Sequence, residues 1–329
     1  MRKLLISTAL VGSLIAGSAF AETKISGKLE ATYGDKQTAA ASAQKYNGAN
    51  IGYDYSLNVT SSAQLTNGMT SKVSVTAVSD GANDGSGGFG NFQDGGLFLT
   101  SGNTTFYIGK DGMAAVDSIV NPKVYAIPED NVKSFTNGNT AEGAVEDNNA
   151  IGIQQKISGG ALTFLYVPQV GEGTDNGDNS SGGGLGSAYE IGYTGKISGV
   201  EVHIGHANTK KALDTSTEDK TTNFGAAYAS GKFAIGASQN RFDSGTTGSD
   251  YDTTLYSATY AVSDTVSVGF HHQIAENESN SNDEKVNSFE VGYNLGALVV
   301  ALNYQQATNV GNLTANDADA WTISLSQAF

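Results

Sequence analysis

Cysteine is absent from this sequence of 329 residues, proline occurs only three times, and no long apolar run follows the N-terminal segment. Without cysteine the chain can form no disulfide framework, no thiolate metal site and no cysteine nucleophile. After residue 21 no stretch approaches the roughly 20 apolar residues that a membrane-spanning helix needs. If the chain crosses a membrane, it must therefore do so as a closed β-barrel, because only a barrel would then give every backbone polar group a partner.

Positive charge is also scarce. The chain carries 18 lysines and arginines against 33 aspartates and glutamates, and its formal net charge is −15. This excess of carboxylates argues against a nucleic-acid partner, because phosphates attract basic surfaces. Glycine is abundant and hydrophobic residues make up only 39%, a composition that suits strands with apolar groups facing lipid and small or polar groups facing water. A secreted β-solenoid adhesin would share this composition, although no repeat of solenoid length occurs.

The N-terminal segment has the features of an export signal. Two basic residues, Arg2 and Lys3, precede an apolar stretch, and a small-x-small cleavage site ends at Ala21. These features predict a cleaved signal peptide over residues 1–21. The alternative, an anchor helix, is disfavoured because the apolar stretch is too short to span a bilayer. We therefore expect a single domain over residues 22–329.

Apolar and polar side chains alternate in segment after segment of that domain, which predicts β-strands with one face apolar and the other polar. In 50–62, for example, Ile51, Leu57 and Val59 share one face and Asp54 lies on the other. Sixteen segments are predicted as strands: 24–35, 50–62, 69–80, 95–101, 103–110, 149–158, 161–168, 187–197, 200–208, 221–230, 232–241, 251–262, 265–274, 285–295, 297–306 and 319–329.

The connections between these segments alternate between short turns and long links. This is the rule of outer-membrane barrels, in which tight turns face the periplasm and long loops face outside. The pattern predicts an all-β fold, a transmembrane antiparallel β-barrel of about 16 strands, wide enough for an aqueous channel. Seven aromatic residues are expected to form interfacial girdles rather than a soluble core: Tyr33, Tyr53, Tyr166, Tyr228, Tyr260, Tyr304 and Trp321.

Motifs for enzymatic chemistry are weak, so we expect the chain not to be an enzyme. A GxGxxG run at 85–90 does not open a helix, as a dinucleotide site requires. His203 and His206, like His271 and His272, fall on opposite faces of a strand and cannot chelate a metal as pairs. The phase of His203 and His271 is inward. A lipid hydrolase would need a histidine on the lipid face. His206 and His272 have this outward phase, but no recognisable nucleophile accompanies either of them.

Cofactors are not expected, with one exception. Oxygen-rich loops can bind Ca²⁺, and four aspartates are candidate ligands for a structural ion: Asp80, Asp84, Asp175 and Asp178. These aspartates lie in two loops, around 80–84 and 175–179, and neither loop has the ligand spacing of an EF-hand. The alternative is that both are solvated acidic loops.

The longest link, 111–148, follows the fifth strand and is the candidate functional segment, because ordinary hairpin loops are far shorter. If it folds into the lumen, its acids would face charged residues of the wall and set a transverse field that filters solutes. The acids of the link that we expect at this constriction are Asp111, Asp117, Glu129 and Asp130. The wall residues of inward phase are Lys28, Lys72, Lys156, Lys196 and Lys232, together with Glu30, Asp54, Glu190, Glu201 and Glu290. The alternative is an external loop with solvated charges.

Three features in this order along the chain resemble the general diffusion porins of Gram-negative bacteria, in particular those of α-proteobacteria. They are the opening strand 24–33 (KISGKLEATY), the strand 104–110 (TTFYIGK) before the long third loop, and the terminal Phe329. The resemblance implies a homotrimer in the bacterial outer membrane, in contact with its lipid and lipopolysaccharide, with the third loop folded inward. It also implies that Phe329 is a signal for the outer-membrane assembly machinery.

One departure from that family concerns positive charge at the constriction. The family's wall there usually carries an arginine cluster, but after the predicted signal peptide the only arginine is Arg241. Lysines could substitute, although they lack the rigid planar fork of arginine. The resemblance implies passive diffusion of small hydrophilic solutes and ions, for which we expect weak cation preference. A substrate-selective channel for sugars or phosphate, and a non-conducting surface barrel or adhesin, remain the alternatives.

Overall fold

The computed structural model describes ten segments of the chain. They are residues 22–38, 48–80, 91–110, 113–116, 149–168, 185–211, 214–245, 250–280, 282–314 and 316–329. Within them the chain forms sixteen β-strands and one short 3-10 helix, η1 (Val310–Asn312). Among the described residues, no helix is long and apolar enough to cross a membrane.

The strands follow one another along the chain, separated by turns or loops. The first eight are β1 (Glu22–Thr38), β2 (Gly48–Gln64), β3 (Thr70–Asp80), β4 (Asn91–Ser101), β5 (Thr104–Lys110), β6 (Ala150–Ile157), β7 (Gly160–Val167) and β8 (Leu185–Ile197). The second eight are β9 (Val200–Lys211), β10 (Asp214–Ser230), β11 (Phe233–Asp243), β12 (Tyr251–Ala261), β13 (Val266–Asn277), β14 (Glu284–Asn294), β15 (Leu298–Thr308) and β16 (Ala318–Ala328).

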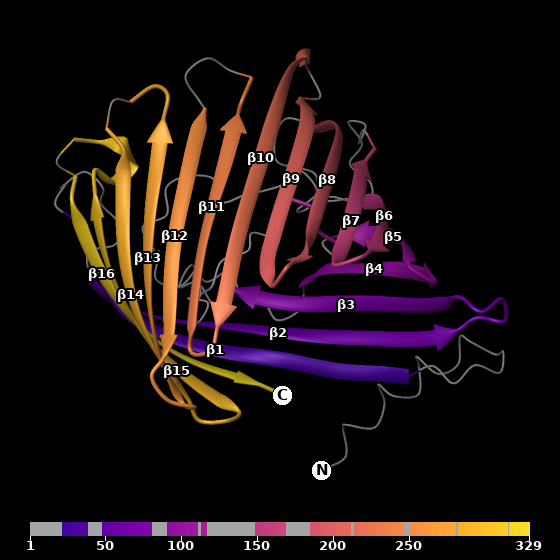
Figure 1. Ribbon diagram of the computed structural model, residues 1–329, viewed down its shortest axis with the longest axis horizontal. Helices are drawn as coiled ribbons and strands as arrows, with labels where there is room; N and C mark the ends of the chain where they lie inside the picture. The colour runs from indigo at the N-terminus through magenta and orange to yellow at the C-terminus, as the bar shows by residue number, and fades with distance from the viewer. Residues whose placement is uncertain are drawn as a thin grey trace.

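Each strand pairs antiparallel with its neighbours, and β1 pairs with β16, so the sheet closes into a barrel (Figure 1). The closing register runs from Lys28 opposite Ala328 to Thr38 opposite Ala318. Beyond it, Gly27 and Phe329 exchange two backbone hydrogen bonds, with N···O distances of 2.9 and 3.0 Å. Closure leaves no free edge, so every strand has two partners. The predicted sixteen-stranded antiparallel barrel is confirmed.

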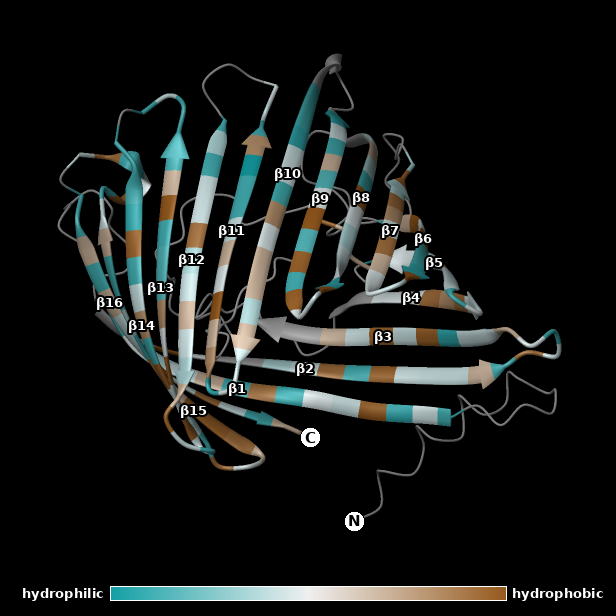
Figure 2. Cartoon of the chain, in the orientation of Figure 1, coloured by the Kyte–Doolittle hydropathy of each residue, from teal (hydrophilic) through white to brown (hydrophobic). Residues whose placement is uncertain are grey.

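Hydrophilic and hydrophobic residues alternate along many of the strands (Figure 2), and the two faces of the barrel wall differ in polarity, as the alternation predicted. Large apolar side chains such as Ile25, Ile204 and Phe224 are exposed on the outside. On the inside, polar residues such as Asn223 and Asn303 are buried. This inversion of a soluble protein's arrangement is what a lipid-facing exterior and an aqueous interior require.

Most of the predicted girdle aromatics lie on this apolar exterior. Tyr33, Tyr166, Tyr228, Tyr260 and Tyr304 are each exposed, and the ring of Trp321 packs edge-on against that of Tyr33 with 5.3 Å between centroids. The side chain of Tyr53 lies outside the described set. Those of the seven predicted girdle residues whose side chains are described therefore do not form a buried core.

The two ends of the barrel are defined here by their connections. The short-turn end carries the turns 65–69, 102–103, 158–159, 198–199, 231–232, 262–265 and 295–297. The opposite end is the long-loop end. In outer-membrane barrels the short turns face the periplasm.

The largest difference from the predicted strands is in β10, which starts at Asp214 rather than at 221. Its first residues are almost all polar, so no alternation marks them in the sequence. They extend the strand because β9 continues beside them, with Glu218 opposite Lys210 and an irregular register between Asp214 and Glu218. Tertiary pairing, and not local pattern, sets this boundary.

Candidate functional site: the barrel lumen

The inner wall of the barrel is lined mainly by hydroxyl and amide side chains. On the strands from β10 to β16, the buried residues of this kind are Thr221, Asn223, Ser238, Asn240, Thr253, Ser257, Gln273, Asn277, Ser288, Asn303, Gln305, Thr322 and Ser324. These groups can exchange hydrogen bonds with water or with a polar solute without attracting ions of one sign. They make the interior of the barrel wettable.

The beginning of the long third link, residues 113–116, runs along this inner wall. Ala115 and Val116 are 3% and 0% exposed. Ala115 belongs to an apolar cluster with Tyr107 of β5, Leu165 of β7 and other residues, and Met113 packs against it. The link therefore starts inside the barrel, as the constriction hypothesis requires.

A row of small residues on three adjacent strands receives this segment. Gly192 of β8 lies opposite Gly205 of β9, and Gly205 lies opposite Asn223 of β10. A Cβ atom built on Gly192 would overlap the carbonyl oxygen of Ala115, and one built on Gly205 would lie 3.1 Å from the same oxygen. Only glycine at these positions lets the two backbones approach so closely.

Asn223 holds the segment 113–116 against these glycines with a hydrogen bond. Its Nδ2 donates to the carbonyl oxygen of Val116, and its Oδ1 lies 2.7 Å from Nε2 of His203. Because the amide oxygen can only accept, Nε2 of His203 must carry the proton. The other ring nitrogen of His203, Nδ1, is 3.1 Å from the hydroxyl of Thr194. The segment is thus held by a buried chain of polar contacts across β8, β9 and β10.

An ion pair and a contact between a histidine and a carboxylate also face the lumen. Lys28 Nζ and Glu30 Oε2 are 2.5 Å apart on β1, and His271 Nε2 and Glu290 Oε2 are 3.2 Å apart between β13 and β14. Asn303 Nδ2 donates to the other oxygen of Glu290 at 3.2 Å. His203 and His271 therefore both face inward, as their phase predicted.

The predicted constriction residues fall into three groups. Asp111, Asp117, Glu129 and Asp130 lie outside the described residues. Of Asp54, the structure gives the strand pairing, between Glu30 and Asp80, but no side chain. Lys28, Glu30, Lys72 and Lys156 have the inward phase, with Lys28 and Glu30 brought together as an ion pair.

The wall lysines lie nearer the short-turn end than the docked segment does. Lys196 is four residues beyond Gly192 on β8, which is about 13 Å at the rise of a β-strand. Lys156 lies next to the last residue of β6, and Lys72 lies opposite Ser62, close to the end of β2. The Nζ atom of Lys72 is 4.7 Å from the ring centroid of Phe98. These lysines therefore surround the mouth at that end and not the level of Ala115.

Sequence reasoning missed Gly192, Gly205 and Asn223, which position the segment. Each has the inward phase, and a glycine in a strand can mark close backbone approach. That signal does not say which glycines stand side by side. Their common row depends on the register of three strands with one another, which only the structure supplies.

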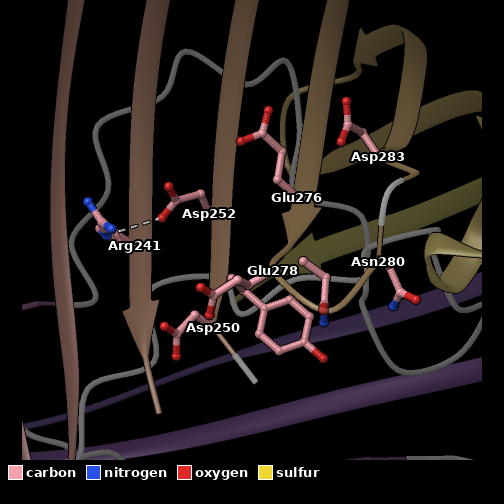
Figure 3. Close-up of a pocket in the computed structure, with 9 residues that line it drawn as sticks. Arg241, Asp250, Asp252, Glu276, Glu278, Asn280 and Asp283 are labelled. Carbon is pink, nitrogen blue, oxygen red and sulfur yellow. Dashed lines mark ion pairs between the residues drawn. The ribbon is translucent and has the colours of Figure 1, made fainter. Parts of the chain in front are cut away.

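Arg241 lies on the outer face of β11 near the long-loop end, and its side chain is not part of the inner wall. It lines a cavity of about 380 Å³ with five carboxylates, and its Nε is 3.6 Å from Oδ1 of Asp252 (Figure 3). The other four carboxylates are Asp250, Glu276, Glu278 and Asp283. Within the described part of the chain, no arginine faces the lumen.

The calcium candidates lie mostly outside the described residues. This is the case for Asp84, Asp175 and Asp178, whereas Asp80 is the last residue of β3 and its side chain is not described. Over the segments that the structure describes, no three acidic or histidine side chains are grouped as a metal site. Calcium binding stays a prediction.

Comparison with known proteins gives a family match. The sequence profile described as Gram-negative porin matches residues 7–296. No curated protein matches the chain. The anion-selective porin from Comamonas acidovorans has a similar structure, with a TM-score of 0.68 at 14% identity over 94% of this chain and 100% of that one.

Variants of the porin from Rhodopseudomonas blastica are also similar in structure. A variant with five substitutions has a TM-score of 0.64 at 15% identity, and a triple mutant has 0.61 at 16% identity. Both alignments cover 94% of this chain and 100% of the other. At these identities the likeness shows the fold alone, whereas the family profile covers most of the chain.

Proposed function

This chain belongs to the Gram-negative porin family, and we propose that small hydrophilic solutes and ions cross its lumen by passive diffusion past a constriction that begins at residues 113–116. As a porin it is a channel of the outer membrane and not an enzyme. The observation that carries the proposal is the docked segment: Ala115 and Val116 are buried against the inner wall, and Asn223 bonds the segment there. A link that enters the lumen narrows the path available to solutes.

Liposome swelling tests this proposal directly. Vesicles that contain the purified protein are placed in isotonic solutions of uncharged sugars of increasing size. We expect swelling rates that fall steeply with solute size, because the constriction sets an upper radius. Equal rates for mono- and tetrasaccharides, or no swelling with any sugar, would contradict the proposal.

For ions we propose weak cation preference. The acids Asp111, Asp117, Glu129 and Asp130 would face the pore from the third link, and the net charge of −15 supports accumulation of cations in the lumen. The Comamonas relative is described as anion-selective, so this preference would set the two proteins apart. Reversal potentials under a KCl gradient measure the preference, and a potential of the anion-selective sign would refute it.

A second candidate, a channel that prefers neutral sugars, is favoured by the inner wall of β10 to β16. Its hydroxyl and amide groups match the alternating donors and acceptors of sugar hydroxyls, whereas no arginine of the described wall could fork around a phosphate. Sugar-dependent block of ionic current at millimolar concentration would favour this candidate over general diffusion. Equal and weak effects of all sugars would favour general diffusion.

We further propose that the chain is exported with loss of residues 1–21, assembles as a homotrimer and contacts lipopolysaccharide. The ring of Phe329 covers Gly27 on the outer face, and its side chain is 69% exposed, which leaves it accessible to another protein from outside the barrel. N-terminal sequencing of the outer-membrane form tests the cleavage. Mass measurement in mild detergent tests the trimer, which a monomer mass would contradict.

A further inference from the structure

Lysines gather at the short-turn end of a chain that is otherwise strongly acidic. We call this set the lysine collar: Lys24, Lys28, Lys72, Lys156, Lys196 and Lys232. Lys72 stands opposite Ser62, Lys156 opposite Ala161 and Lys196 opposite Glu201, all on the inward phase. Lys232 is in the turn between β10 and β11, where its Nζ donates to Val262 O at 3.3 Å.

Few carboxylates balance the collar. Glu30, paired with Lys28, and Glu22, Glu201 and Asp264 lie at the same end, out of the 33 acids of the chain. The contact between Lys196 and Glu201 is 3.4 Å long with both side chains more than half exposed, so it is weak and screened by salt. Within the described residues, ion pairs involve Lys28 and Lys196 but not the other four lysines of the collar.

Over β11 to β14, the described part of the long-loop end has the opposite charge. From β11 to β14 it presents Asp243, Asp250, Asp252, Glu276, Glu278 and Asp283 against Arg241 and Lys285. Asp243, Asp252 and Glu276 have the outward phase of their strands, as Arg241 does, so they act on the channel entrance from the outside of the rim and not from the inner wall. Most of these acids line the cavity of Figure 3, where their carboxylates gather on one stretch of the rim. We call these six acids the acidic rim.

We infer that the collar and the acidic rim act as two charge zones in series, so that the channel passes more current when the long-loop side is positive. The inference rests on the proposed conduction. Each zone enriches its counter-ion: anions at the collar, cations at the acidic rim. A field that drives cations inward from the rim and anions inward from the collar fills the lumen with carriers. The reverse field empties it.

The strength of this effect depends on salt. At 1 M salt the Debye length is about 3 Å, so the zones are screened from the pore axis, whereas at 0.01 M it is about 30 Å and the field of each zone reaches across its entrance. We expect the ratio of currents at opposite voltages to be on the order of 2 at 0.01 M KCl and to approach 1 at 1 M.

The experiment is a current–voltage measurement on the full-length mature protein in planar bilayers with equal KCl on both sides. Because the chain has no cysteine, the variant Asn280→Cys at the long-loop end reports orientation through a bulky, impermeant thiol reagent added to one side. A conducting channel with a linear current–voltage relation at low salt overturns the inference while leaving the proposed function intact. Absence of any conductance overturns the proposed function as well.

Two charge-matched variants locate the source of the asymmetry. The collar variant combines Lys72→Gln, Lys156→Gln, Lys196→Gln and Lys232→Gln. The rim variant, as control, removes the same number of positive charges at the other end: Lys210→Gln, Lys220→Gln, Arg241→Gln and Lys285→Gln. We expect the ratio to fall to about 1 in the collar variant and to persist in the rim variant. An unchanged ratio in the collar variant, with native circular dichroism, refutes the inference.

Discussion

The close approach of Ala115 to Gly192 gives the sharpest prediction for the constriction. In the variant Gly192→Ala, the added methyl group would occupy the space of the Ala115 carbonyl oxygen. Because the wall is fixed by two neighbouring strands, the segment 113–116 must move toward the pore axis. Overpacking of this kind costs about 1–3 kcal/mol, and losing the bond from Asn223 to Val116 adds about 1 kcal/mol.

The strain of Gly192→Ala falls on the docked segment, so the barrel itself should remain intact. We expect single-channel conductance in planar bilayers to drop and current noise to rise, because the segment then narrows the lumen and is held less firmly. Gly236→Ala, which adds the same methyl group to the inner wall of β11, is the control and should conduct as the natural protein does. If Gly192→Ala kept the natural conductance and noise, the docking geometry described here would be wrong.

Three further predictions concern the dock, the lipid face and the closure of the barrel. Asn223→Ala removes two hydrogen bonds and leaves two buried partners, the carbonyl oxygen of Val116 and Nε2 of His203, at a loss of about 1–3 kcal/mol for each. It should raise current noise without changing secondary structure. Ile204→Lys, on the exposed apolar face, should lower the free energy of unfolding in lipid by about 2–4 kcal/mol. The control Ser326→Lys, on the inner face of β16, should lower this free energy far less. Equal losses in the two variants would contradict the assignment of faces. Gly27→Val would collide with the Phe329 ring and should lower the thermal unfolding temperature, which a calorimetric scan would show; an unchanged transition would mean that this contact does not stabilise the closure.

The fold could be predicted largely from the sequence because a membrane barrel obeys few and local rules. Side chains alternate with a period of two, so the phase of His203 and His271 followed from neighbouring apolar residues. The alternation of short turns with long links indicated antiparallel neighbours. The extension of β10 to Asp214 could not be predicted, because its polar residues are ordered by pairing with β9.

The site was less accessible to sequence reasoning. Phase tells which residues face inward but not how high along the barrel each one stands. For Lys72 and Lys156 the alternation predicts the inward phase, and the structure adds that they lie toward the short-turn end. The row of Gly192, Gly205 and Asn223 depends on the register of three strands, and residues far apart in sequence meet there.

Single-channel recording tests the central claim, a water-filled channel through a lipid-facing barrel. Purified protein is added to a planar bilayer in 1 M KCl, with no other protein present. A water-filled channel should give discrete, stable steps of current whose size scales with the conductivity of the salt solution. A current that stayed at the baseline of the bare bilayer, although the protein had inserted, would contradict it.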